Sequence, residues 1–268
     1  MTSLPARHAW LPITLLAAGL LSGCGSASKI DPRDMTAEQV YASAKEDMSS
    51  GNYESAAQGL NRVEALAAGT LLGQQAQLEL AYVKWRAGEK EVALATIDRF
   101  LKLNPSSPAY DYALYLRGLV NFNDDLGLLG AFSRQDLSER DQAAARESWQ
   151  SFNQLVQQFP KSRYAADASV RMDYIFNSLA NHELHVARHY YRRGAYVAAV
   201  NRAQRAVADY QQSPATEEAL YIMAQSYERL GLKELAVDAD RVLRKNFPDS
   251  RYFTDGVRRP DRAWWQFW

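Results

Sequence analysis

Pairs of alanines recur along this chain with a spacing of twelve residues. The four pairs are Ala44 and Ala56, Ala81 and Ala93, Ala187 and Ala199, and Ala224 and Ala236. A distance of 37 residues separates the first pair from the second and the third pair from the fourth. Antiparallel helices approach closely only where alanine or glycine leaves room between them. The spacing therefore predicts an all-α chain built from repeated helical hairpins.

Glycine and proline punctuate the same repeat. A glycine follows the first helix of four repeats, at Gly51, Gly88, Gly194 and Gly231. A proline follows the second helix at Pro105, Pro160 and Pro248, and Pro214 lies just beyond the remaining one. Glycine accepts the positive φ of a helix C-terminus, and proline ends a helix because it lacks an N–H. This punctuation predicts a superhelical array of five tetratricopeptide (TPR)-like repeats.

The third repeat is longer than the others. Gly118 lies 37 residues after Ala81, but Ser148 follows it by 30 residues instead of twelve. We therefore expect an insertion at about residues 123–141, and loops of this length are often functional. It is either a partner contact or a plain connection. The expected units are repeats one to three over 37–160 and repeats four and five over 161–250, joined by a long helix that Ser162 caps and that reaches Tyr191.

The start of the chain has the pattern of a secretory signal peptide. Arg7 precedes an apolar run over 11–21, which is too short for a mature membrane helix. The run leads into Leu-Ser-Gly-Cys, where Cys24 is the only cysteine in the chain. This ending resembles the lipobox of bacterial lipoproteins, which implies removal of 1–23 and a covalent lipid on the Cys24 thiolate. A chance free thiol is the alternative. Gly25, where an aspartate would signal retention, favours the outer membrane over the inner one, and 24–36 would form a lipidated linker.

Composition argues against several classes of function. The chain has 31 basic and 31 acidic residues, so its balanced charge gives no reason to expect nucleic acid as a partner. A single cysteine leaves no disulfide or thiolate metal site. His182, His185 and His189 share a helical pattern, but they lack the glutamate spacing of a zinc protease. We expect no metal, no cofactor besides the lipid and no enzyme activity. A metal-dependent enzyme centred on His185 and His189 is the remote alternative.

Aromatic residues gather at the positions that face the concave side of a TPR array. Numbered from the small residue of each first helix, these positions hold Tyr41, Tyr82, Trp85, Tyr112, Tyr115 and Phe122. Aromatic side chains at helical spacing often belong to a core, which is the alternative interpretation. However, other apolar residues already supply the core positions of repeat two. We therefore expect an aromatic groove suited to an extended or helical peptide that carries aromatic side chains.

Three segments carry a more specific resemblance. Residues 97–105 (IDRFLKLNP), 111–119 (DYALYLRGL) and 193–202 (RGAYVAAVNR) are similar to the BamD/ComL family, the TPR lipoproteins of the outer-membrane β-barrel assembly machinery. The resemblance implies a periplasmic scaffold that holds other assembly lipoproteins and recognises unfolded outer-membrane barrel proteins through its N-terminal repeats. It also implies that Asn201 and Arg202 dock on a POTRA domain of a BamA-type insertase. Arginine suits that role because its fork binds a carboxylate bidentately.

Two questions stay open at the level of sequence. A general TPR adaptor lipoprotein for cell-envelope or peptidoglycan assembly would share this scaffold, since a fold does not fix a function. The second question is the basic-aromatic tail over 251–268, which ends in Ala-Trp-Trp-Gln-Phe-Trp. It could lie at lipid headgroups, dock on a partner, fold back on the last repeat or occupy the groove. Docking on a partner or a repeat is the preferred interpretation.

Overall fold

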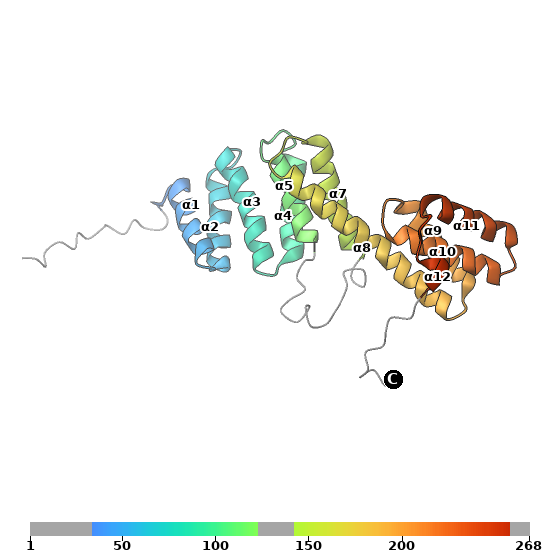
Figure 1. Ribbon diagram of the computed structural model, residues 1–268. Coiled ribbons are helices and arrows are strands. Elements are labelled where there is room, and N and C mark those ends of the chain that lie inside the picture. Colours follow the sequence, from blue (N-terminus) through green and yellow to red (C-terminus); the bar gives the residue numbers. More distant parts are fainter. Residues whose placement is uncertain (1–33, 123–141, 258–268) are drawn as a thin grey trace, which may run out of the picture.

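The computed structural model describes residues 34–122 and 142–257 (Figure 1). Cys24, the expected signal peptide, the expected insertion at 123–141 and the residues 258–268 lie outside the described ranges. Within those ranges every regular element is a helix, which confirms the expected all-α class.

The helices form five consecutive antiparallel pairs. The pairs are α1 (Ala37–Ser49) with α2 (Tyr53–Leu66), α3 (Leu71–Arg86) with α4 (Lys90–Leu103), α5 (Tyr110–Asn121) with α7 (Gln142–Gln158), α8 (Ala165–Arg192) with α9 (Tyr196–Asp209), and α10 (Ala215–Arg229) with α11 (Lys233–Asn246). A short helix, α12 (Tyr252–Asp255), follows. Each pair packs on the next, so the pairs line up as an elongated array (Figure 1). The predicted five repeats are confirmed.

Small residues set the distance between paired helices. The eight alanines of the four pairs are all between 0% and 6% exposed. In repeat three the pair is Gly118 and Ser148, and the Ser148 hydroxyl donates a 2.8 Å hydrogen bond to the Gly118 carbonyl oxygen. Phe152 is fully buried against the same spot, where a Cβ on Gly118 would lie 2.4 Å from its ring. The longer spacing predicted for repeat three is therefore correct.

The turns also repeat. All four predicted glycines between paired helices have a positive φ, from 75° at Gly231 to 86° at Gly88. Between repeats, a serine hydroxyl accepts a hydrogen bond from the backbone N–H two residues later, at Ser107, Ser162, Ser213 and Ser250. The expectation that Ser162 caps α8 was wrong. The N-cap residue is Tyr164, because Ser162 closes the preceding turn and its hydroxyl also donates to Asp111 at 2.7 Å.

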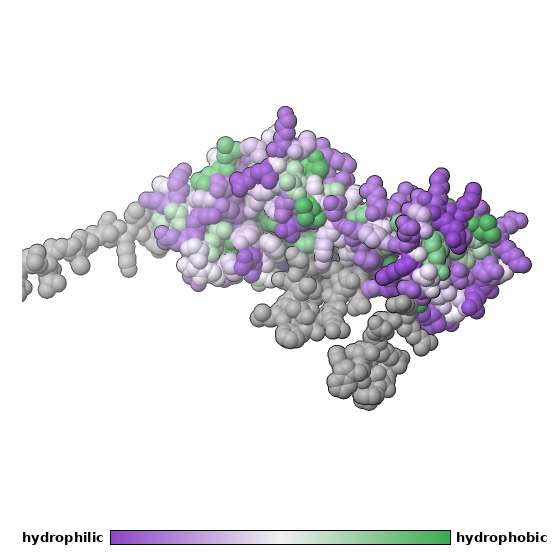
Figure 2. Space-filling model, viewed as in Figure 1, coloured by the Kyte–Doolittle hydropathy of each residue, from purple (hydrophilic) through white to green (hydrophobic). Residues whose placement is uncertain are grey.

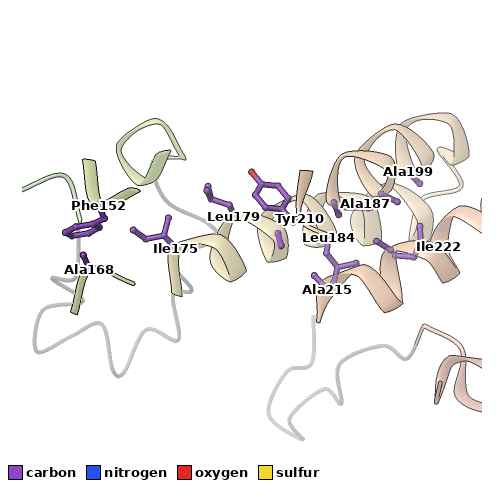
Figure 3. Packing of buried hydrophobic residues seen from close by; sticks show 14 of the residues in the cluster. Phe152, Ala168, Ile175, Leu179, Leu184, Ala187, Ala199, Tyr210, Ala215 and Ile222 are labelled. Carbon is purple, nitrogen blue, oxygen red and sulfur yellow. The ribbon is translucent and has the colours of Figure 1, made fainter. Parts of the chain in front are cut away.

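The long helix predicted between the two halves is α8, with 28 residues. Its N-terminal part packs on α7 and its C-terminal part on α9. One cluster of buried residues follows it without a break, from Phe152 past Leu179 and Tyr210 to Ile222 (Figure 3). The halves therefore share a single continuous core along α8.

Past α11 the described residues form no further hairpin, and the face of α11 that corresponds to the α10-facing side of α9 is open to solvent. In α9, Val200 and Ala203 are 5% and 0% exposed and pack toward α10. The residues 37 positions later on α11 are Val237, which is 66% exposed, and Asp240, which forms a 2.7 Å ion pair with Arg244. A polar outer face is what keeps a terminal repeat soluble. Figure 2 shows mostly hydrophilic residues over this end of the molecule.

The contact between Gly118 and Phe152 yields a stability prediction. Gly118→Ala places a methyl group 2.4 Å from the Phe152 ring, and the overpacking should lower the free energy of unfolding by about 1–3 kcal/mol in urea denaturation. In a Phe152→Leu background the same change should cost less, because the ring is gone. An equal cost in both backgrounds would show that the contact does not limit the approach of α5 to α7.

Candidate functional site

The first helices of repeats one to three carry the predicted groove residues. Tyr41 is on α1, Tyr82 and Trp85 are on α3, Tyr112 and Tyr115 are on α5, and Phe122 follows the end of α5. All six side chains are half-buried. Each therefore both packs within the protein and presents part of its surface to solvent. Their role in binding stays a prediction.

A polar cluster forms one end of this surface. The Tyr41 hydroxyl donates to Glu79 Oε1 at 2.8 Å, and Lys45 Nζ lies 3.0 Å from the same oxygen. Gln75 Nε2 donates to the Tyr41 hydroxyl at 2.6 Å. Burial and the neighbouring Glu79 carboxylate raise the pKa of Tyr41 well above its usual value, so the phenol stays protonated. The cluster fixes α1 to α3 at the groove surface.

A hollow of about 360 Å³ lies next to this cluster, between α3 and α5. Its lining includes Leu71, Gln75, Leu78 and Tyr112. Leu78 is also part of the core, whereas Leu71 is 68% exposed at the rim. The floor is apolar and one edge is polar, which is the usual character of a site that receives a side chain.

Tyr164, which the sequence analysis did not single out, joins the two tyrosines of α5. Its ring stacks on Tyr115 at a centroid distance of 4.8 Å and lies 5.5 Å from Tyr112. Burial and the surrounding tyrosines and Glu79 raise the pKa of Tyr112 to about 12. The three rings form one continuous aromatic surface from α5 to the start of α8.

Charged residues of α8 continue the surface toward Phe122. The Tyr115 hydroxyl donates to Asp167 at 2.7 Å, and Arg171 pairs with Asp167 at 2.6 Å. Burial alone would raise the pKa of Asp167, but the hydrogen bonds from Arg171 and Tyr115 hold it below its usual value. Arg171 also lies 5.2 Å from the Phe122 ring centroid, a cation–π distance. This end of the groove is therefore aromatic and ionic.

Tyr82 and Trp85 have a different environment from the other four predicted groove residues. Their rings meet edge to face at 6.1 Å, and both pack against the buried core of repeats two and three. Arg86 donates to the Tyr82 hydroxyl at 3.2 Å. Neither residue lines the hollow between α3 and α5. Tyr82 and Trp85 thus pack on the core while part of each side chain stays accessible, and their role in the groove stays a prediction.

A sequence signal existed for Tyr164. The segment Phe-Pro-Lys-Ser-Arg-Tyr at 159–164 recurs as Phe-Pro-Asp-Ser-Arg-Tyr at 247–252. Tyr252 stacks on Tyr221 at 5.6 Å, as Tyr164 stacks on Tyr115. Tyr115 and Tyr221 each lie three residues before the small residue of their helix. A search for short repeats at the boundaries would thus have placed both tyrosines beside a first helix.

In the C-terminal half, a buried ion-pair network joins three helices. Arg188 binds Glu218 through two hydrogen bonds of 2.6 Å each, and the Tyr252 hydroxyl donates to Glu218 at 2.7 Å. Glu218 is 6% exposed. Burial favours its neutral form, but the hydrogen bonds and the charge of Arg188 lower its pKa below the usual value. This network ties α8, α10 and α12 together beside a hollow of about 280 Å³.

The two predicted docking residues lie side by side on α9. Asn201 is exposed. Arg202 Nη1 lies 3.1 Å from Glu183 Oε2 of α8, and the arginine side chain is 34% exposed. Glu183 is only 5% exposed, and a buried carboxylate needs a paired charge. Arg202 therefore neutralises Glu183 while it presents part of its guanidinium to solvent.

The described residues include no group of three or more histidine, cysteine or acidic side chains placed to hold a metal ion, the three histidines of α8 included. Likewise, no helix in the ranges 34–122 and 142–257 has both the length and the apolar character to cross a membrane.

Comparison with known proteins gives a consistent result. A family described as outer membrane lipoprotein matches residues 33–243. The outer membrane protein assembly factor BamD of Neisseria meningitidis serogroup B is 43% identical over 253 residues, which cover 92% of this chain and 95% of the relative. The BamD proteins of Xylella fastidiosa strain Temecula1 and Haemophilus influenzae are 35% and 33% identical, and the matches cover 89% and 87% of this chain and 82% and 88% of theirs.

The depressed pKa of Glu218 predicts a pH dependence. An acid whose pKa is lower in the folded state stabilises the fold above its ordinary pKa of 4.5, and this stability is lost as the pH falls through the folded value. Glu218→Gln should therefore lower the free energy of unfolding by about 1–3 kcal/mol at pH 7, because Arg188 loses its counter-charge. The difference between the two proteins should shrink below about pH 4.5 in thermal unfolding. A constant difference from pH 7 to pH 3 would contradict the assignment.

Proposed function

Because the chain belongs to the family of outer membrane lipoproteins that includes the BamD assembly factors, we propose that it acts in outer membrane protein assembly as a non-enzymatic, lipid-anchored scaffold. Membership of the family is the observation that supports the role in assembly. The finer points, which are substrate recognition, docking on a BamA-type insertase and the anchor at Cys24, are argued from the residues in the following paragraphs.

The aromatic concave surface of the N-terminal half supports recognition of unfolded barrel proteins. The surface runs from the Tyr41 cluster across the hollow beside Tyr112 to the stacked Tyr115 and Tyr164. In an extended strand, alternate side chains point to the same side. A barrel strand with aromatic residues at every second position would thus present a row of rings to this surface. Edge-to-face and offset ring contacts would hold it.

Docking on the insertase is assigned to Asn201 and Arg202 of α9. Both are accessible, and Glu183 holds the Arg202 guanidinium in a defined position. A pre-positioned guanidinium loses less side-chain entropy when a carboxylate binds it. An acidic side chain on a POTRA domain of a BamA-type insertase is the proposed partner. Other assembly lipoproteins would attach to the same scaffold.

The lipid on Cys24 would place the scaffold at the outer membrane, facing the periplasm. Several acyl chains on one residue bind a membrane firmly, since each buried methylene contributes about 0.8 kcal/mol. The residues between Cys24 and the start of α1 at Ala37 would then tether the first repeat close to the membrane surface.

The groove proposal predicts a specific loss of binding. Leu71→Asp puts a charge on the rim of the hollow without removing core packing, because Leu71 is 68% exposed. It should weaken photo-crosslinking to an aromatic barrel-strand peptide by about tenfold, which is 1.4 kcal/mol. Leu103→Asp is the matched control, since Leu103 is 66% exposed and does not line the hollow. Equal crosslinking of both variants would remove the groove from the proposal.

The docking proposal needs a test that preserves the fold. Arg202→Glu would face the buried Glu183 and could unfold the protein, so it cannot separate docking from stability. The single variant Glu183→Gln keeps the positive charge of Arg202. The double variant, Glu183→Gln with Arg202→Gln, removes both charges but keeps a hydrogen-bonded pair of side chains. We expect the first variant to co-purify with the insertase and the double variant to bind at least about tenfold more weakly. Circular dichroism should show both folded. Equal binding of the single and the double variant would contradict the role of Arg202 in docking.

A further inference from the structure

A slot at the junction of the two halves results from the length of α8. With 28 residues, α8 exceeds the 16 residues of α3 by about 18 Å of helix. The extra turns displace α9 along α8 and away from α7. The space left between the end of α9 and the middle of α7 is a hollow of about 280 Å³.

Aromatic and apolar side chains form the walls of this slot. Trp149 of α7 and Phe176 of α8 are half-buried, and Phe176 meets Tyr210 edge to face at a centroid distance of 5.2 Å. Leu179 forms part of the floor. In Figure 3, Leu179 and Tyr210 lie at the centre of the core that links the two halves. The slot is thus an open hollow with an apolar floor, set over the continuous core.

Two exposed charges of opposite sign stand at the rim. Arg146 belongs to α7, and Asp209 ends α9. An aromatic ring placed in the slot would lie near the Arg146 guanidinium, which favours a cation–π contact. A basic side chain next to that ring would find the Asp209 carboxylate. The slot therefore suits an aromatic residue accompanied by an arginine.

We propose that the slot is the docking site of this chain's own residues 258–268, with an indole ring of Trp264 or Trp265 between Trp149 and Tyr210. The segment holds four aromatic residues and three arginines. Arg262 and Trp264 are two positions apart, so both point to the same side of an extended segment. Arg262 would meet Asp209 while Trp264 enters the slot.

The residues that follow Val257 are long enough to reach the slot. Val257 packs on the same core cluster as Tyr210, and Gly256 lies beside Arg188 of α8. Arg188 and Leu179 are nine residues apart, which is about 14 Å along the axis and half a turn around a helix about 10 Å wide. The path from Val257 is then roughly 21 Å, and seven extended residues span roughly 23 Å. Trp264 is the seventh residue after Val257.

Docking of residues 258–268 would hold the two halves of the array against each other. The slot combines α7, which belongs to the groove half, with α9, which carries Arg202. A segment seated across both helices would brace them against each other. This inference does not depend on the proposed docking partner or substrate, since every residue involved belongs to this chain.

Disulfide trapping tests the proposal on the mature chain. Cys24→Ser removes the only cysteine, and Gln150→Cys with Ala263→Cys then places one thiol at the slot and one beside Trp264. The control pairs Ala263→Cys with Lys245→Cys. Lys245 is next to Arg244, whose guanidinium lies 4.3 Å from the Phe253 ring, so an undocked tail would meet it at least as often. Docking should make the slot disulfide form about tenfold faster than the control.

Two further variants should lose the rapid disulfide trapping at the slot. Trp264→Ser with Trp265→Ser, and separately Asp209→Asn, should reduce the rate of slot trapping toward that of the control. Equal or faster trapping at Lys245 would overturn the proposal. So would disulfides that form only between chains, which would assign the slot to a second copy. Loss of trapping on addition of anionic phospholipid vesicles would assign the tail to a lipid surface instead.

Discussion

The close approach of paired helices at small residues is the constraint on which the rest of the structure depends. Ala44 packs so tightly against α2 that a Cβ on Gly59 would lie 2.9 Å from it, and Gly118 leaves no room for a Cβ beside Phe152. Because the helices of a pair touch at these points, the large side chains of each first helix are displaced to its flanks. One flank faces the core of the next repeat, and the other carries the aromatic surface of Tyr112, Tyr115 and Tyr164. The position of this surface thus follows from the alanine register.

The length of α8 divides this array into two parts with different chemistry. Its N-terminal turns supply Asp167 and Arg171 to the aromatic groove. Its C-terminal turns supply Glu183 and Arg188, which form ion pairs with α9 and α10. One helix therefore contributes charged residues to both proposed surfaces.

The two Phe-Pro-x-Ser-Arg-Tyr turns show how one local motif serves two purposes. In both turns the serine accepts a hydrogen bond from the tyrosine N–H, and the tyrosine ring stacks on a tyrosine of the preceding first helix. Tyr164 extends an aromatic surface because Tyr112 occupies the neighbouring position. Tyr252 instead donates to Glu218 and closes an ionic network. The backbone turn is the same, and the neighbouring side chain on the first helix decides the chemistry.

The sequence by itself determined the repeats, the glycine turns, the extra residues of repeat three and the long connecting helix. These features depend on spacing along the chain, because helical period, backbone conformation and chain length are local properties. Only the tertiary structure decided that Glu183 pairs with Arg202, that Tyr164 stacks on Tyr115, that Tyr82 and Trp85 pack on the core, and that a slot opens between α7 and α9. Those contacts join residues of different helices, and their geometry follows from how the helices of a hairpin and successive hairpins pack on one another and from the length of α8. The period of the repeat does not determine how the hairpins pack on one another. The sequence pattern therefore predicted the surfaces but not the partners of their residues.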